Sequence, residues 1–162
     1  MKPMGVLAIA FLLLLSGCTQ PSKGAQWRAA QQDDIREAVF RHQISSHYGR
    51  LHMTTTLYFL QIGWGKDPRD PSDQLLKRFA DLQVEVKKLS GCTHSPRGVK
   101  DKRTGRPGMI LEVADITWRN DSDVEVEGGY FANGLAGSSH TYRVRRVAGK
   151  WTVTKDTPKA RA

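Results

Sequence analysis

Strand-like runs separated by short turn sequences fill the last third of the chain, and this pattern restricts the fold more than any other feature. The runs contain many β-branched and aromatic residues, which favour strands. They cover residues 109–119, 124–131, 140–147 and 151–155. Because the separators contain Asn, Asp and Gly and are too short for a crossover, successive runs should pair antiparallel. The sequence therefore predicts a C-terminal four-stranded meander.

Alternation within these runs indicates a sheet with one buried and one solvated face. The apolar positions of the last two runs are Tyr142, Val144, Trp151 and Val153. On the neighbouring run, Glu125 and Glu127 are expected to face Arg143 and Arg145 across the sheet. Such surface pairs fix the register of a sheet more than they stabilise it.

The segment before the meander predicts two helices and two further strands. Asp34 followed by Glu37 resembles a capping box, and Asp70 followed by Pro71 is typical of a helix start. The predicted elements are a helix from Ile35 to about His47, a strand over residues 54–63, a helix from Asp70 to about Asp81 and a short strand at Val84 and Val86. The fold class is therefore α+β, with N-terminal helices packed on a curved antiparallel sheet.

The N-terminus carries a short apolar leader that ends in Leu-Ser-Gly-Cys. Lys2 supplies a positive charge, and the uncharged run over residues 4–15 is too short to span a bilayer comfortably. The leader resembles the bacterial lipoprotein signal. The resemblance implies lipidation of Cys18, cleavage after Gly17 and acylation of the new N-terminus. Thr19 follows the cysteine, which by the family's sorting rule favours the inner leaflet of a Gram-negative outer membrane. A Gram-positive host would place the protein on the outer face of its only membrane.

These features divide the 162-residue chain into four parts. Residues 1–17 form the predicted signal peptide, and residues 18–32 are polar enough to serve as a flexible tether. Residues 33–157 are expected to form one α+β domain, followed by a polar tail over residues 158–162.

The chain is basic, with a formal net charge of +9, which favours anionic partners. The segment over residues 97–108 is too polar to pack and is expected to be a basic loop, and four of its cations are candidates for contact with an anionic surface. They are Lys100, Lys102, Arg103 and Arg106. The expected partners are the membrane, reached through lipidated Cys18, and anionic lipid headgroups, peptidoglycan or an envelope protein. Nucleic acid is excluded by compartment.

The order of elements over residues 33–155 resembles the cystatin-like cone shared by nuclear-transport-factor-2-like proteins and ketosteroid isomerase. The run VEVEGGYFANGLAGSSHTYRVRRVAGKWTVTKD also resembles small uncharacterised bacterial proteins. Enzymes with the cone architecture place acids, tyrosines and histidines on the concave sheet face. The residues of this chain that the resemblance assigns to such a pocket are Asp115, Tyr130, His140 and Tyr142.

The sequence alone does not show which face of the sheet the Asp115 side chain lies on. It is in phase with Leu111 and Val113, but the alternate positions of the same run, which include Ile110 and Ala114, are equally apolar. No nucleophile–base motif is present. His42, His47 and His52 recur every five residues, a spacing that does not bring ligands onto one helix face. No metal site, cofactor or catalytic set is therefore predicted, and the remaining thiol, Cys92, is expected to be buried.

The sequence favours a membrane-anchored envelope lipoprotein whose domain is a non-catalytic binding or interaction module. One alternative is a small pocket enzyme of the isomerase or dehydratase type that uses Asp115 and His140. A second alternative is a structural protein of envelope maintenance. These readings differ in whether a polar-lined cavity exists and whether an acid in it is held in a dry environment.

Overall fold

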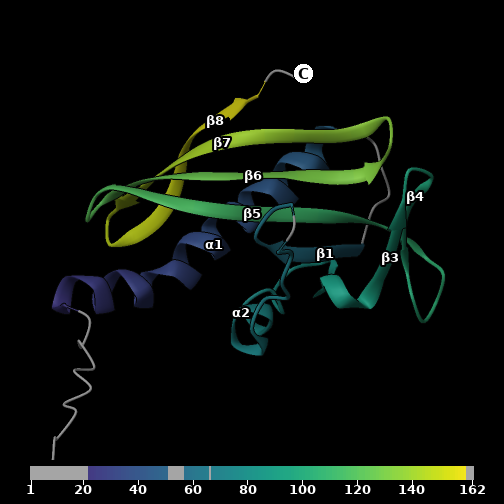
Figure 1. The fold of residues 1–162 in the computed structure, drawn as a ribbon, viewed down its shortest axis with the longest axis horizontal. Helices are drawn as coiled ribbons and strands as arrows, with labels where there is room; N and C mark the ends of the chain where they lie inside the picture. The colour runs from purple at the N-terminus through teal and green to yellow at the C-terminus, as the bar shows by residue number, and fades with distance from the viewer. Residues whose placement is uncertain (1–21, 51–56, 66, 160–162) are drawn as a thin grey trace, which may run out of the picture.

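The computed structural model of the chain describes residues 22–50, 57–65 and 67–159 and has the expected α+β class. One long N-terminal helix lies against a large, mostly antiparallel sheet (Figure 1). The helices are α1 (Lys23–Arg50) and α2 (Asp73–Lys77), with a 3-10 turn over Leu89–Gly91. The strands are β1 (Leu57–Ile62), β2 (Glu85–Lys88), β3 (Cys92–Ser95), β4 (Gly98–Asp101), β5 (Pro107–Asn120), β6 (Asp123–Asn133), β7 (Ala136–Val147) and β8 (Lys150–Pro158).

The sheet follows the order β2-β1-β5-β6-β7-β8, and the β3–β4 hairpin joins it through β4 and β5. Strands β5 to β8 pair antiparallel with their neighbours in the sequence. In contrast, β1 pairs parallel with both β2 and β5. The β1–β2 pair is connected through the segment that contains α2, since parallel neighbours need a crossover connection.

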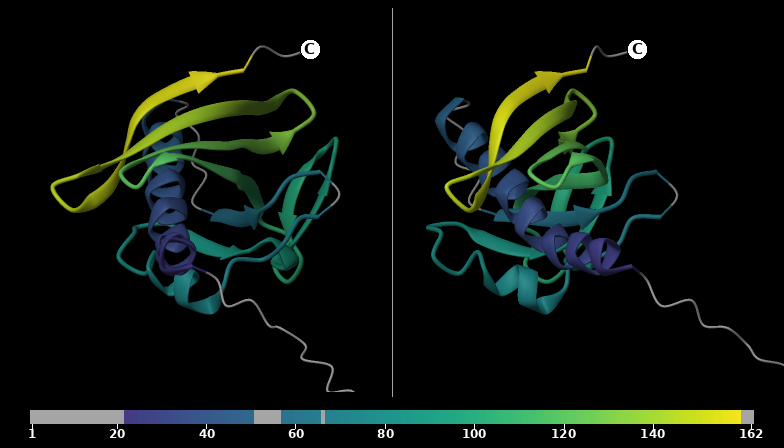
Figure 2. Two further views of the ribbon diagram at one scale, coloured as in Figure 1. Left: turned by 60° about the vertical axis from the view of Figure 1, so that its left-hand side comes forward. Right: turned by 90° about the vertical axis from the view of Figure 1, so that its left-hand side faces the viewer.

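Helix α1 crosses one face of the sheet diagonally, and its apolar residues form the main core with that face (Figure 2). The helix contributes Ile35, Val39, Phe40 and Ile44, all buried. Near its N-terminal end, the rings of Trp27, Trp118 and Trp151 follow one another at centroid distances of 5.7 Å. We call this face of the sheet the helix face, and the opposite one the outer face.

A smaller apolar cluster lies on the outer face, beneath the β3–β4 hairpin. Its buried members are Leu57, Phe59, Cys92, Val99 and Ile110. Burial raises the pKa of the Cys92 thiol, so the thiolate is disfavoured. The expectation of a buried cysteine is therefore confirmed.

The predicted start of the first helix at Asp34 is wrong, because α1 begins at Lys23 and runs through that position. It therefore includes part of the segment that the sequence analysis assigned to a tether. Asp34 and Glu37 do not cap the helix; both accept hydrogen bonds from Arg78. The second helix is shorter than expected and begins after Ser72, whose hydroxyl accepts from the backbone N–H of Leu75.

The basic segment over residues 97–108 is more ordered than the predicted loop. It contains all of β4 and the beginning of β5. Asp101 closes the turn between them by accepting from the backbone N–H groups of Arg103 and Thr104, at 2.9 and 2.8 Å. A side chain that satisfies turn donors in this way lets a polar, glycine-containing segment form a hairpin without apolar periodicity.

A β-bulge in β5 determines where Asp115 lies. Val113 pairs with Gly128 and Ile116 pairs with Val126, so Ala114 and Asp115 together stand opposite Glu127. The extra residue reverses the alternation of the strand. Leu111 and Val113 before the bulge, and Ile116 and Trp118 after it, therefore all pack on the helix face. Asp115 is exposed instead of being in phase with that core.

Candidate functional site

A groove on the outer face, with a volume of about 400 Å³, is a candidate site because it combines apolar walls with an acid that has no described partner. Its apolar surface comes from Ile110, Phe131 and the half-exposed indole of Trp64. Its polar lining consists of Gln61, His94, Glu112, Ser138 and Ser139. Apolar walls with a few polar groups are typical of small-molecule sites.

Glu112 is the only acid among the described residues that line this groove. It alternates with the core residues Leu111 and Val113, so its side chain lies on the outer face with Ile110. Burial raises the pKa of its carboxyl group. Within the described part of the chain, the carboxylate accepts no hydrogen bond and forms no ion pair. A half-buried acid without a partner is costly to keep ionised, and such groups concentrate at functional sites.

Two adjacent glycines of β6 lie opposite the part of β5 that carries Glu112. Gly129 pairs directly with Glu112 and has no side chain to place beside its carboxylate. A Cβ at Gly129 would stand 2.2 Å from the carbonyl oxygen of Ser138. Gly128 serves the helix face, where a Cβ would stand 3.4 Å from Nε2 of Gln43 and 2.4 Å from the carbonyl oxygen of Glu112.

Trp64 is positioned by the turn that follows β1. The backbone N–H of Gly63 donates to the carbonyl of Val113 at 2.9 Å, and the Gln61 amide donates to the carbonyl of Gly63 at 3.0 Å. Gly63 has a φ of +85°, and a Cβ there would lie 2.5 Å from the carbonyl oxygen of Asp67. Only glycine fits this position, so the turn places the indole at the wall of the groove.

A second hollow of about 360 Å³ adjoins the groove and shares Trp64 and Ser139 with it. Asp115 and His140, the two residues of the enzyme alternative, both line this hollow. Glu127 also lines it, and its carboxylate lies 2.6 Å from Nζ of Lys159.

A histidine cluster lies on the helix face between α1, β7 and β8. Asp156 joins its two imidazoles, with Nε2 of His42 at 3.1 Å and Nδ1 of His140 at 2.5 Å. The ring of His140 stacks on Tyr142 at a centroid distance of 5.6 Å, and His42 contacts Tyr142 edge-on. Gln43 donates through Nε2 to the carbonyls of Glu112 and Gly129, each at 3.0 Å.

The electrostatics of this cluster follow from its pairing. Burial alone would raise the pKa of Asp156, but the hydrogen bonds from His140 and His42 outweigh it, and the pKa lies below its usual value. Burial raises the pKa of Tyr142 well above 10, so the phenol stays protonated. The cluster binds α1 to the end of the sheet and leaves the Asp156 carboxylate with partners on both oxygens.

The predicted pocket residues are only partly brought together. Tyr130, His140 and Tyr142 lie in or beside the histidine cluster, with Tyr130 and His140 at a centroid distance of 6.3 Å. Asp115 is displaced from the helix face by the bulge. Three residues of these sites were not predicted from the sequence: Gln43, Glu112 and Asp156. Glu112 lies two residues after Ile110 and so on the same face of the strand, but the sequence did not show which face of this strand is the core.

The four predicted cations of the basic segment differ in their surroundings. Arg106 forms an ion pair with Glu85 at 2.7 Å, and Nζ of Lys102 donates to the carbonyl of Ser90 at 2.8 Å. Lys100 and Arg103 are exposed. The segment therefore presents a basic surface in which part of the charge is already engaged.

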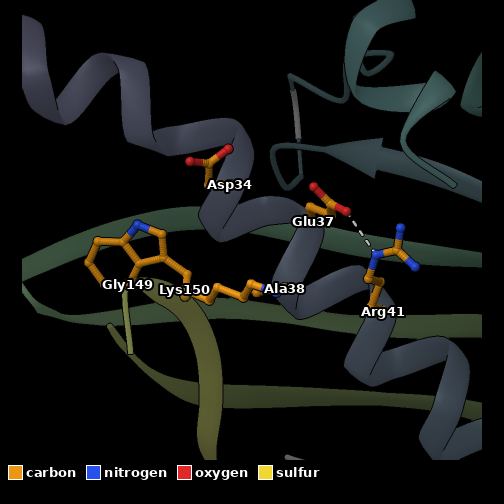
Figure 3. Close-up of a pocket in the computed structure, with 7 residues that line it drawn as sticks. Asp34, Glu37, Ala38, Arg41, Gly149 and Lys150 are labelled. Atoms are coloured by element: carbon orange, nitrogen blue, oxygen red, sulfur yellow. Dashed lines mark hydrogen bonds and ion pairs between the residues drawn. The ribbon is translucent and has the colours of Figure 1, made fainter. Parts of the chain in front are cut away.

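A third hollow, of about 540 Å³, lies between α1 and the turn joining β7 to β8 (Figure 3). Asp34, Glu37, Arg41 and Lys150 supply its charged lining. Both carboxylates are engaged, Glu37 with Arg41 at 2.8 Å and Asp34 with Arg78 at 2.6 Å. This hollow therefore lacks an unpaired carboxylate of the kind that distinguishes the groove.

Within residues 22–50, 57–65 and 67–159, no group of three His, Cys, Asp or Glu side chains is arranged to hold a metal ion. The side chain of His47 and all of His52 lie outside the described structure. In the same residues, no helix combines the length and apolar character that crossing a bilayer requires. No family model matches the chain, and no curated protein or solved structure is significantly similar to it.

Proposed function

We propose that this protein is a lipid-anchored component of a bacterial envelope whose domain binds a small ligand in the outer-face groove without transforming it. The leader that ends in Cys18 supports the anchoring. The observation that carries the binding role is Glu112, a carboxylate without a described partner in a groove with apolar walls. A ligand that satisfied this group would remove the cost of leaving it unpaired.

The location in this proposal is the inner leaflet of an outer membrane, with the domain in the periplasm. The finer architecture belongs to the same proposal: a curved sheet of the cystatin-like cone type that ends in a four-stranded meander. The sequential antiparallel pairing of β5 to β8 supports it. The exposed part of the basic segment, with Lys100 and Arg103, offers a surface for an anionic envelope component such as peptidoglycan.

One observation favours the enzyme alternative, namely the raised pKa of Glu112. A carboxyl group held in an apolar groove can act as a general acid or base near neutral pH. The residues first considered for this role fit it less well. Asp115 is exposed, and Nδ1 of His140 is bound to Asp156. A structural role in envelope maintenance would need none of these groups.

Anchoring is tested on the full chain expressed in a Gram-negative host. The parent should fractionate with outer membranes, and intact-mass analysis should show a chain that begins at Cys18 and carries diacylglycerol and an N-terminal acyl group. Cys18→Ala should abolish both properties. A mature parent protein without diacylglycerol would contradict the anchoring.

Ligand binding is tested with neutral aromatic fragments and the purified mature lipoprotein in lipid nanodiscs. Fragments of about ten heavy atoms should shift the NMR signal of the Trp64 indole N–H, since Trp64 forms a wall of the groove. Trp64→Phe identifies that signal, and empty nanodiscs correct for partition into lipid. If no fragment shifts the Trp64 signal, the groove is not a ligand site.

A further inference from the structure

We propose that the groove selects ligands that carry a positively charged ammonium group on an apolar body, with Glu112 as the counter-ion and Trp64 as the aromatic wall. This inference rests on the proposed binding function and names its ligand class. The first argument is the state of the Glu112 carboxylate. An occupant of the groove withdraws this carboxylate further from solvent, so the occupant must itself supply charge or hydrogen-bond donors.

The charges around the groove favour a cation over an anion. None of the described residues that line the groove is Lys or Arg. Two cations elsewhere on the outer face are paired, Arg119 with Glu125 at 2.6 Å and Lys159 with Glu127 at 2.6 Å. The net positive charge of the chain acts at long range and is screened within about 8 Å at physiological salt. The nearest charge that a bound ligand meets is therefore that of Glu112.

Trp64 adds an attraction that is specific for cations. Its indole is 46% exposed although it lines both the groove and the adjoining hollow. The face of an indole ring is the best aromatic partner for an ammonium group. Ile110 and Phe131 offer apolar surface for the rest of the ligand. The volume of about 400 Å³ lies at the lower end of the range for small-molecule pockets, which indicates a small ligand.

Asp115 provides a matched control for Glu112. It lies on the same strand and lines the adjoining hollow, and it has no described ion pair. Because it is exposed, water solvates and screens its charge, so it should contribute little to the affinity for a cation.

The inference also fixes how affinity should depend on pH. Only ionised Glu112 attracts an ammonium group, and burial raises its pKa, so affinity should fall as pH falls through that value. His94 on β3 is the other titratable group that faces the groove, and its protonation would also repel a cation. The remaining lining residues of β1, β5, β6 and β7 do not titrate. His94→Gln therefore isolates the contribution of Glu112.

The test compares three probes of one shape: 2-phenylethylamine, 2-phenylethanol and 3-phenylpropionate. Binding to the mature lipoprotein in nanodiscs is followed by the Trp64 indole signal. The amine should bind about tenfold more tightly than the alcohol, and the carboxylate most weakly. Glu112→Gln should remove the advantage of the amine over the alcohol. Asp115→Asn should change the affinity for the amine by less than about twofold.

The outcomes separate this inference from the function on which it rests. If the alcohol binds as well as the amine in the parent, the groove binds ligands but the ligand class is wrong. If the preference for the amine survives in Glu112→Gln, the assignment of the counter-ion is wrong. If none of the three probes shifts the Trp64 signal, the inference and the proposed binding function both fail.

Discussion

Two carboxylates on opposite faces of one sheet behave in opposite ways. Asp156, on the helix face, is bound by His42 and His140, and its pKa lies below the usual value. Glu112, on the outer face, has no described partner, and burial raises its pKa. Both groups are partly withdrawn from water, so burial does not explain the difference. Pairing does: hydrogen bonds to the charged form outweigh desolvation at Asp156 and are missing at Glu112.

The same contrast extends to the neighbours of the two groups. On the helix face, Nε2 of Gln43 has three acceptors, the carbonyls of Glu112 and Gly129 and the phenol oxygen of Tyr142. The pairing on this face has two exceptions: within the described residues, Arg36 Nε and Gln43 Oε1, both on α1, are buried without a partner. The helix face is thus a docked interface, whereas the outer face keeps an acid open to solvent and ligands.

The largest loss of stability is expected from Gly128→Ala, which disturbs the packing on the helix face. The added methyl group would stand 2.4 Å from the carbonyl oxygen of Glu112, and Tyr142 and Gln43 leave it no space. We expect a loss of about 3 kcal/mol in the free energy of unfolding, measured by urea denaturation. Gly24→Ala is the control, because nothing lies within 4 Å of its Cβ and alanine favours the helix by about 0.5–1 kcal/mol. Equal stability of Gly128→Ala and the parent would mean that β6 and α1 are not tightly packed there.

Asp156→Asn should remove the charge that joins the two imidazoles. We expect a loss of about 1–2 kcal/mol at pH 7, as for a partly exposed, charge-assisted hydrogen bond. The folded pKa of Asp156 is depressed, so its contribution is present above the pKa of unfolded Asp and is lost as pH falls through the folded value. The difference between parent and variant should therefore vanish in acid. A constant difference down to pH 2 would show that the loss is steric and not electrostatic.

Glu112→Gln should change the free energy of unfolding in the opposite direction to Asp156→Asn and stabilise the fold. The folded pKa of Glu112 is raised, so ionisation opposes folding once pH exceeds the pKa of unfolded Glu. At pH 8 the variant should melt higher than the parent by roughly 2 °C. The gain should shrink as pH falls and the parent takes up its proton. A lower melting temperature in the variant at pH 8 would mean that the carboxylate has a stabilising partner after all.

Asp115→Asn should show the smallest effect, below about 0.5 kcal/mol. The residue is exposed, and the bulge places it away from the core. Both this variant and Glu112→Gln remove one negative charge from β5. Thermal melts of the two over the same pH range therefore show how much of the effect on stability comes from the burial of the carboxylate. A large, pH-dependent change in stability for Asp115→Asn would instead support Asp115 as the pocket acid of the enzyme alternative.

The strands of the C-terminal half could be predicted because their pattern is local. Alternation and turn residues predicted β5 to β8 to within a few residues at most ends, and Glu125 does pair with Arg143. Glu127 instead pairs with Thr141, and Asp123 with Arg145. The parallel pairing of β1 with β5 was not foreseen, because it joins segments far apart in the chain and leaves no local pattern.

The candidate site was harder to predict for a physical reason. A bulge adds one residue to a strand, so every residue after it faces the opposite side from that expected by alternation. The residue types around Ala114 and Asp115 do not indicate a bulge. Apolar residues at both phases of the strand therefore looked contradictory, although Leu111 and Val113 before the bulge and Ile116 and Trp118 after it all pack on the helix face. The two adjacent glycines of β6 also gave no sign of the site from sequence. Gly128 makes room for Gln43 on the helix face, and Gly129 pairs directly with Glu112.

The early start of α1 would limit the distance between the domain and any membrane in which a lipid on Cys18 was inserted. The helix begins at Lys23, and 23 − 18 gives five residues from Cys18, which span at most roughly 18 Å by any path. A lipid on Cys18 would hold this end of the helix close to the bilayer. The β3–β4 hairpin, which carries His94 of the groove, lies at the opposite end of the long axis (Figure 1). A chain anchored in this way would carry the hairpin side of the groove at the end of the molecule far from the lipid (Figure 1), since α1 alone is about 42 Å long.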